Sequence, residues 1–191
     1  MRKRVGILIS GRGSNMRALI EAAKDPAYPA EIVLVVSNVA DAAGLVFAAD
    51  AGIAAKVIPH KQFPTREAFD EALDAALVAA RVEIVCLAGF MRILSDGFAR
   101  KWERRLLNIH PSLLPAYKGT RVHERVIAAG ERESGCTVHF VVPELDAGPA
   151  IAQAKVRVIP GDTPEMLAAR ILVEEHKLYP KALAMVAEGR T

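Results

Sequence analysis

The stretch Val-Gly-Ile-Leu-Ile-Ser-Gly-Arg-Gly-Ser-Asn, residues 5–15, decides the fold of this chain. Its apolar first half predicts a buried strand, and the two glycines that follow predict a sharp turn into a helix. A helix that begins directly after such a turn offers unpaired N–H groups and the positive end of its dipole to an anion. We therefore expect a phosphate site at Gly13, Ser14 and Asn15, with a plain strand-to-helix turn as the alternative.

The phosphate is expected to be a monoester. Met16 stands where the dinucleotide fingerprint has its third glycine, and the second expected strand ends in Ser37-Asn38 without an acidic residue for a ribose. No Gly-Lys-Ser or Gly-Lys-Thr follows the glycines, so a Walker loop is also absent.

Apolar, β-branched runs alternate with helical patterns along the first half of the chain. Strands are expected at residues 5–10, 32–37, 55–58 and 84–87, and helices at 15–24, 42–51 and 66–80. In the less regular second half we expect strands at 106–110, 136–142 and 151–158, and a helix at 122–129. A final helix is expected from the N-cap Thr163, interrupted near Tyr179-Pro180 and stopped at Gly189.

This order predicts an α/β fold. We expect a single domain over residues 1–191, an open, mostly parallel, twisted sheet with helices on both faces, and late strands that are candidates for antiparallel pairing. The composition, 52% hydrophobic and 25% charged, is that of a globular enzyme.

Several classes are disfavoured. A net charge of +3 without a basic run argues against nucleic acid, and no apolar stretch is long enough for a membrane span. The short apolar run after Met1 does not suit a signal peptide, so a cytoplasmic protein is expected. Cys86 and Cys136 lie far apart without a Cys-x-x-Cys pair, which favours buried reduced thiols over a metal site.

Asn108 and His110 lie two residues apart in the run Asn-Ile-His-Pro-Ser. On a strand their side chains leave the same face, with Cα atoms roughly 7 Å apart. An amide that holds a carbonyl oxygen and an imidazolium that stabilises charge suit acyl transfer. From spacing alone, a capping asparagine and a structural histidine are an equal alternative.

A polar loop, Glu-Leu-Asp-Ala-Gly-Pro at residues 144–149, separates the two late strands. A carboxylate beside His110 would favour its charged form and fix its orientation. Spacing does not place Asp146 there, and a solvated turn residue is the alternative. No nucleophile elbow or His-Glu-x-x-His run is present, which favours direct transfer without a covalent intermediate or a metal.

Five motifs in order resemble the folate-dependent phosphoribosylglycinamide formyltransferase family. They are Ile-Ser-Gly-Arg-Gly-Ser-Asn (9–15), Leu-Ala-Gly-Phe-Met-Arg-Ile-Leu (87–94), Asn-Ile-His-Pro-Ser-Leu-Leu-Pro (108–115), Gly-Cys-Thr-Val-His-Phe-Val (135–141) and Glu-Leu-Asp-Ala-Gly-Pro (144–149). The resemblance covers essentially the whole chain. It implies transfer of a formyl group from 10-formyltetrahydrofolate to the amine of phosphoribosylglycinamide (glycinamide ribonucleotide) in de novo purine biosynthesis, by a monomer or homodimer.

The resemblance also implies roles for residues. The catalytic trio would be Asn108, His110 and Asp146, the last keeping His110 charged. The nucleotide would be bound by Gly13, Ser14, Asn15, Met16 and Glu175. The reduced folate would be bound by Arg66, Met91, Arg92, Ile93, Leu94, Asn108, Val142, Pro143, Glu144, Leu145 and Asp146. His139 and His176 are expected to be structural or to support the site residues without being catalytic, and His60 is expected to be a loop residue.

One departure stands out. The family commonly carries Gly-Leu-His-Thr-His where this chain has Gly-Thr-Arg-Val-His, so Arg121 replaces the first histidine and His123 keeps the second. The rival readings are a formyltetrahydrofolate hydrolase, a methionyl-tRNA formyltransferase and a nucleotide-binding module without catalysis. The first two normally carry a further domain, for which 191 residues leave no room, and the third has no use for the Asn–His pair.

Overall fold

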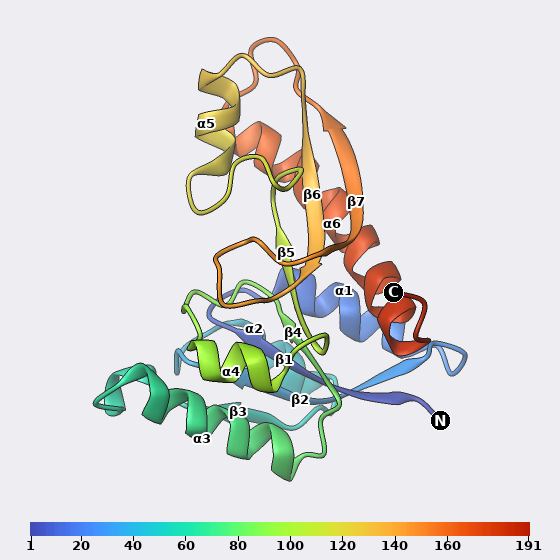
Figure 1. Cartoon of the computed structure of the whole chain (residues 1–191). Coiled ribbons are helices and arrows are strands. Elements are labelled where there is room, and N and C mark those ends of the chain that lie inside the picture. Colours follow the sequence, from blue (N-terminus) through green and yellow to red (C-terminus); the bar gives the residue numbers. More distant parts are fainter.

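The computed structural model describes all residues, 1–191, and places seven strands in one sheet (Figure 1). The parallel strands are β1 (Lys3–Ile9), β2 (Ala30–Ser37), β3 (Ala55–Val57), β4 (Ile84–Leu87) and β5 (Leu106–His110). Two antiparallel strands follow, β6 (Glu133–Phe140) and β7 (Ala150–Arg157). The order is β3-β2-β1-β4-β5-β6-β7, so the mostly parallel sheet with late antiparallel strands is confirmed.

The helices follow the expected patterns, with two short additions, a 3₁₀ helix where His60 was expected in a loop and a six-residue α-helix. They are α1 (Ser14–Ala23), α2 (Gly44–Asp50), the 3₁₀ helix η1 (His60–Gln62), α3 (Arg66–Ala79), α4 (Asp96–Lys101), α5 (Val122–Ala128) and α6 (Pro164–Ala187). The sequence pattern did not predict α4, which is six residues long. Its N-cap is Ser95, whose hydroxyl accepts a hydrogen bond from the Phe98 N–H at 3.3 Å.

The interruption expected near Tyr179-Pro180 is wrong, because α6 continues through Pro180. Proline removes one N–H from the ladder, but tertiary contacts on both sides compensate. The Tyr179 hydroxyl is fully buried and lies 2.9 Å from the Leu87 carbonyl and 3.2 Å from the Leu107 carbonyl. The Tyr28 hydroxyl donates to the Pro180 carbonyl at 2.6 Å. Packing against α1 and the sheet therefore keeps the helix continuous.

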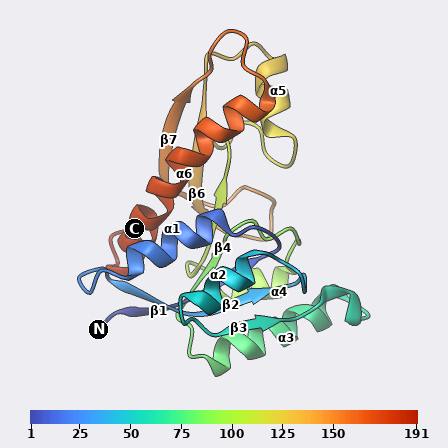
Figure 2. The same ribbon diagram turned by 180° about the vertical axis from the view of Figure 1, so that it is seen from behind.

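Two apolar clusters cover the two faces of the sheet. Val5, Ile7 and Ile9 pack in the cluster that contains the buried residues of α1 and α6, whereas Leu8 packs in the cluster of α3 and α4. Figures 1 and 2 show the same division, with α1, α2 and α6 on one face and α3 and α4 on the other. Because both faces are covered, the parallel strands have apolar side chains on both sides.

The parallel strands β1, β4 and β5 are neighbours, so their carboxyl ends meet at one edge of the sheet. The chain leaves these ends into the glycine loop, into residues 88–95 and into the loop 111–121. The β6–β7 loop, residues 141–149, folds back over β5 (Figure 1). No helix in the structure combines the length and apolarity of a membrane-spanning segment.

Candidate active site

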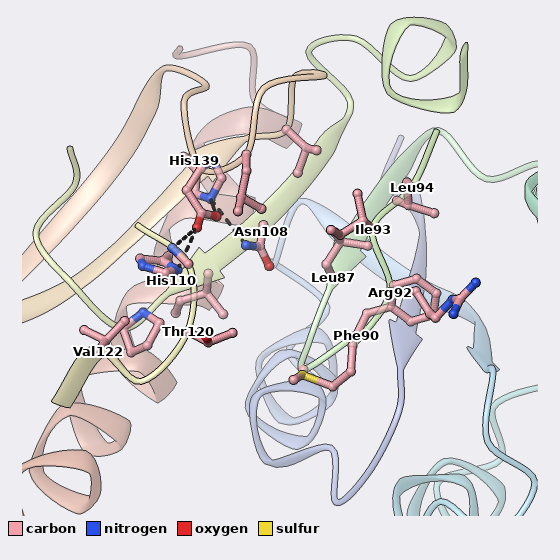
Figure 3. Close-up of a pocket in the computed structure, with 18 of the residues that line it drawn as sticks. Leu87, Phe90, Arg92, Ile93, Leu94, Asn108, His110, Thr120, Val122 and His139 are labelled. Atoms are coloured by element: carbon pink, nitrogen blue, oxygen red, sulfur yellow. Dashed lines mark hydrogen bonds and ion pairs between the residues drawn. The ribbon is translucent and has the colours of Figure 1, made fainter. Parts of the chain in front are cut away.

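A cleft of about 660 Å³ opens between the β4–α4 loop on one side and β5 with the β6–β7 loop on the other (Figure 3). Most residues expected at the site line it. These are Asn15, Met91, Arg92, Ile93, Leu94, Asn108, His110, Val142, Pro143, Glu144, Leu145, Asp146 and Glu175. Four others do not line it: Gly13, Ser14, Met16 and Arg66.

His110 and Asp146 form a buried pair at the end of β5. The His110 Nδ1 atom lies 3.4 Å from Asp146 Oδ2, and both side chains are less than a tenth exposed. On its other side, the His110 Nε2 atom lies 2.9 Å from the Tyr117 carbonyl oxygen. A carbonyl only accepts, so Nε2 carries the hydrogen and Nδ1 is the atom that faces the carboxylate.

Asn108 points into the cleft beside this pair. Its Nδ2 atom lies 3.3 Å from His139 Nε2, and His139 Nδ1 in turn lies 2.9 Å from the Phe140 carbonyl oxygen. The two contacts are compatible only with a neutral His139 that donates from Nδ1 and accepts at Nε2. Burial lowers the pKa of His139, which favours this neutral form. Asn108 is therefore oriented by His139 and keeps one N–H for a ligand.

The glycine loop presents backbone groups to the cleft edge. Gly13 has φ of +69° and precedes the first turn of α1, which has no side-chain cap. The N–H groups of Ser14, Asn15 and Met16 make no backbone hydrogen bond, as the first turn of a helix requires. The Met16 side chain is fully buried in the core, so only its N–H remains for a phosphate.

Asn15 and Glu175 meet in the cleft although 160 residues separate them, with Asn15 Nδ2 donating to Glu175 Oε2 at 2.8 Å. Glu175 is 7% exposed. Burial raises the pKa of Glu175, and the hydrogen bond from Asn15 acts in the opposite direction. The buried Asn15 Oδ1 has no partner. Unpaired buried polar atoms at a cleft are suited to a polar ligand that completes their hydrogen bonds.

The opposite wall of the cleft is apolar and open. Met91 and Ile93 are more than half exposed on this wall, and Leu145 is more than half exposed on the β6–β7 loop across the cleft. Arg66 lies next to this wall, in a neighbouring pocket of about 250 Å³ shared with Met91, Arg92 and Ile93. A flat apolar ring with an anionic extension fits such a surface.

Ser10 links the two binding segments. Its Oγ accepts from the Met91 N–H at 2.8 Å and donates to Asn38 Oδ1 at 2.6 Å, and its own N–H donates to the Gly89 carbonyl at 3.2 Å. Ser10 therefore connects the start of the glycine loop by hydrogen bonds to the β4–α4 loop, which carries Met91.

The sequence reasoning missed Ser10 and the position of His139. The register opposes Asn108 and His139 on β5 and β6. An explicit antiparallel pairing of these two strands would have revealed that pair.

The remaining polar residues and the two cysteines make no contact with the His110–Asp146 pair that the structure records as a hydrogen bond or ion pair. Arg121 is 75% exposed at its side chain and pairs with Glu124. His123 lines the cleft, and burial, followed by the nearby His110, lowers its pKa. Burial raises the pKa of both Cys86 and Cys136 to about 12, so neither is activated as a nucleophile. No cluster of three or more His, Cys, Asp or Glu side chains forms a metal site.

The sequence and the fold of this chain are similar to those of known proteins. Residues 3–183 match the formyl transferase family. The trifunctional purine biosynthetic protein adenosine-3 of Drosophila pseudoobscura pseudoobscura is 55% identical over 190 residues, which make up 98% of this chain and 14% of that protein. The phosphoribosylglycinamide formyltransferase of Escherichia coli is 46% identical over 184 residues, 96% of this chain and 87% of the relative.

A crystal structure gives the same result. Phosphoribosylglycinamide formyltransferase from Brucella melitensis superposes with a TM-score of 0.94 at 53% identity, covering 98% of this chain and 96% of that one. The chain thus spans only a small part of the trifunctional relatives but most of the single-function ones. It belongs to the formyl transferase family.

Proposed function

We propose that this member of the formyl transferase family moves the formyl group of 10-formyltetrahydrofolate to the amine of glycinamide ribonucleotide, a step of purine biosynthesis. The observation that carries the proposal is the buried pair His110–Asp146 beside the oriented amide of Asn108 in one cleft. Relatives named for this reaction share the fold and about half of the sequence. Among the acceptors of formyl transferases, a nucleotide fits best, because the glycine loop offers free N–H groups to a phosphate.

The proposed chemistry is direct transfer. The amine nitrogen forms a bond to the formyl carbon, and the carbonyl oxygen becomes an oxyanion next to the free N–H of Asn108 and the imidazolium of His110. The carboxylate of Asp146 stabilises the imidazolium. The C–N10 bond then breaks, the electron pair returns to N10 of tetrahydrofolate, and the proton lost by the amine replaces the formyl group there.

The two substrates are assigned to different sides of the cleft. The free N–H groups at the start of α1 hold the phosphate, and the buried carboxyl of Glu175 binds a polar group of the nucleotide near Asn15. The apolar wall around Met91 and Ile93 takes the pterin ring, and Arg66 suits the carboxylates of the folate.

One assay tests the proposal. Purified protein is given 10-formyltetrahydrofolate with and without glycinamide ribonucleotide, and both formylated nucleotide and free formate are measured. We expect product only with the acceptor. The variants His110→Ala and Asp146→Asn should lower kcat by roughly 100- to 10,000-fold, because both affect the charged imidazole. Formate release that needs no acceptor would overturn the transferase and favour a hydrolase.

A further inference from the structure

In the loop between β5 and α5, beside His110 and Asp146, every second residue from Tyr117 to Arg121 has a positive φ. Tyr117, Gly119 and Arg121 have φ of +56°, +79° and +55°, with the residues between them in ordinary conformations. Left-handed backbone at Tyr117 and Arg121 is unfavourable for side chains of this size. Such conformations persist where surrounding contacts hold them, and they concentrate at functional sites.

Two backbone groups of this loop contact the His110–Asp146 pair directly. The Tyr117 carbonyl accepts from His110 Nε2 at 2.9 Å. The Gly119 N–H donates to Asp146 Oδ2 at 2.9 Å, and that same oxygen lies 3.4 Å from His110 Nδ1. One acceptor and one donor of a single short segment therefore hold both partners of the pair.

Arg125 holds the segment from the opposite side. Its Nη1 donates to the Lys118 carbonyl at 2.7 Å and to the Thr120 carbonyl at 3.3 Å, and its guanidinium lies 5.4 Å from the centre of the Tyr117 ring. The Lys118 carbonyl and the Gly119 N–H belong to one peptide group. A donor on the carbonyl of a peptide group polarises it and strengthens its N–H as a donor. Arg125 thus acts on Asp146 through one peptide plane.

We propose that residues 117–120, held by Arg125, form a backbone clamp that sets the tautomer and orientation of His110 and fixes Asp146 against it. The inference rests on the proposed function, because it assigns the clamp to the transfer reaction. Arg125 and Gly119 are positioning residues and touch no reacting atom. In the clamped state the neutral imidazole carries its hydrogen on Nε2, and a second proton enters at Nδ1, where Asp146 stabilises it.

A matched pair of glycines tests the clamp. Gly119→Ala and Gly130→Ala both place alanine at left-handed φ, +79° and +69°, and neither new Cβ meets an atom within 4 Å. We expect an equal loss of thermal stability in both variants. Only Gly119→Ala should lower kcat, by about 10- to 100-fold, as a displaced reacting group does, with KM for both substrates nearly unchanged. Equal kcat in the two variants would overturn the clamp.

Variants of Arg125 test the clamp without placing a side chain at a left-handed φ. Arg125→Gln removes the guanidinium from an exposed helix position, and Arg125→Lys retains one donor for the loop carbonyls. We expect kcat to fall in the order wild type, Arg125→Lys, Arg125→Gln, without a change in the unfolding midpoint that exceeds that of Gly130→Ala. An Arg125→Gln enzyme with wild-type kcat would also overturn the clamp.

The tautomer is read directly by nitrogen NMR. In protein labelled with ¹⁵N-histidine, the His110 signals are assigned by their loss in His110→Gln. We expect neutral His110 to carry its hydrogen on Nε2 in wild type and Gly130→Ala, and to become a mixture of tautomers in Gly119→Ala and Arg125→Gln. A wild-type signal with the hydrogen on Nδ1 would overturn the clamp. The spectrum needs no substrate, so it decides the clamp even if the formyl-transfer assay fails.

Discussion

Two regions of the sheet contribute different kinds of groups to the same cleft: the parallel region β1–β4, and the region β5–β7, in which neighbouring strands pair antiparallel. The parallel region supplies the backbone N–H groups at the start of α1 and the apolar wall around Met91. From β5 onward the chain supplies polar side chains that contact one another in the cleft: Asn108, His110, His139 and Asp146. In the proposed reaction, binding and chemistry are therefore divided between two parts of one sheet.

Strand direction explains the division. Parallel strands joined by crossover helices place their carboxyl ends at one edge of the sheet, where loops offer backbone groups and helix N-termini. Antiparallel neighbours place residues directly opposite each other, with Cβ atoms about 4.5–5.5 Å apart. The pair Asn108–His139 uses this geometry, since β5 and β6 oppose these residues. The division predicts that variants of the two regions affect different kinetic constants.

The largest difference in kcat between the two regions is expected from a pair of asparagines, Asn108 within β5 and Asn38 directly after β2. Asn108→Ala removes the amide proposed to hold the oxyanion and should lower kcat by roughly 100- to 1,000-fold. Asn38→Ala at the end of β2 removes contacts to Ser10 and His60 and should mainly cost about 1 kcal/mol of folding free energy. Steady-state kinetics and urea unfolding measure both. If Asn38→Ala lowered kcat as much as Asn108→Ala does, the proposed division between a binding region and a catalytic region would be wrong.

A smaller effect is expected at the glycine loop. Gly13→Ala brings a Cβ to 2.9 Å from the Met16 methyl and 3.3 Å from the Gly44 Cα, which displaces the start of α1. KM for the nucleotide should rise about tenfold, the equivalent of one weakened hydrogen bond to a charged group, while kcat changes little. Gly52→Ala has the same left-handed φ, +72°, without a close neighbour, and is the control. A defect in kcat rather than KM would contradict the prediction.

The smallest effect concerns stability and is expected at Asp162. This acid supports the fold, whereas Asp146 is the acid of the proposed mechanism. Asp162 accepts from both Arg170 nitrogens at 2.8 Å and from the Ile159 N–H at 2.8 Å. These bonds lower the pKa of Asp162 to about 2, from an ordinary 3.8. The carboxylate therefore stabilises the fold above its ordinary pKa, and this contribution is lost as pH falls toward 2.

Asp162→Asn should accordingly unfold at lower urea than wild type at pH 7, with a gap that narrows as pH falls below 4, and with kcat unchanged. Exposed Asp41→Asn should show no gap at any pH. A gap that does not depend on pH would assign the effect to packing instead of charge.

The division also marks what the sequence could predict. The parallel region follows local rules, namely apolar runs, helix periodicity and glycine turns, so its strands and the loop at Gly13 were predictable. Asn108 and His110 were predictable as a pair because strand spacing puts them on one face. The position of Asp146 was not, because a loop that folds back over β5 depends on tertiary contacts with Gly119 and His110.

Two misses have the same origin. The short α4 depends on its Ser95 cap and on packing of Phe98 and Trp102, more than on its own six residues. Pro180 was expected to break α6 by a local rule, yet the buried Tyr179 and the bond from Tyr28 override it. Where tertiary contacts decide a conformation, residue patterns do not show it.

The contact between Asn15 and Glu175 also has a consequence for synthesis of the chain. The two residues are 160 positions apart, and at about 5–20 residues per second their emergence from the ribosome is separated by about 8–32 s. During that interval the start of α1 lacks its partner from α6, and its free N–H groups face water. The cleft beside Asn15 is therefore incomplete until residue 175 has left the ribosome, and a truncated product that stops before residue 175 lacks the Glu175 carboxyl that contacts Asn15.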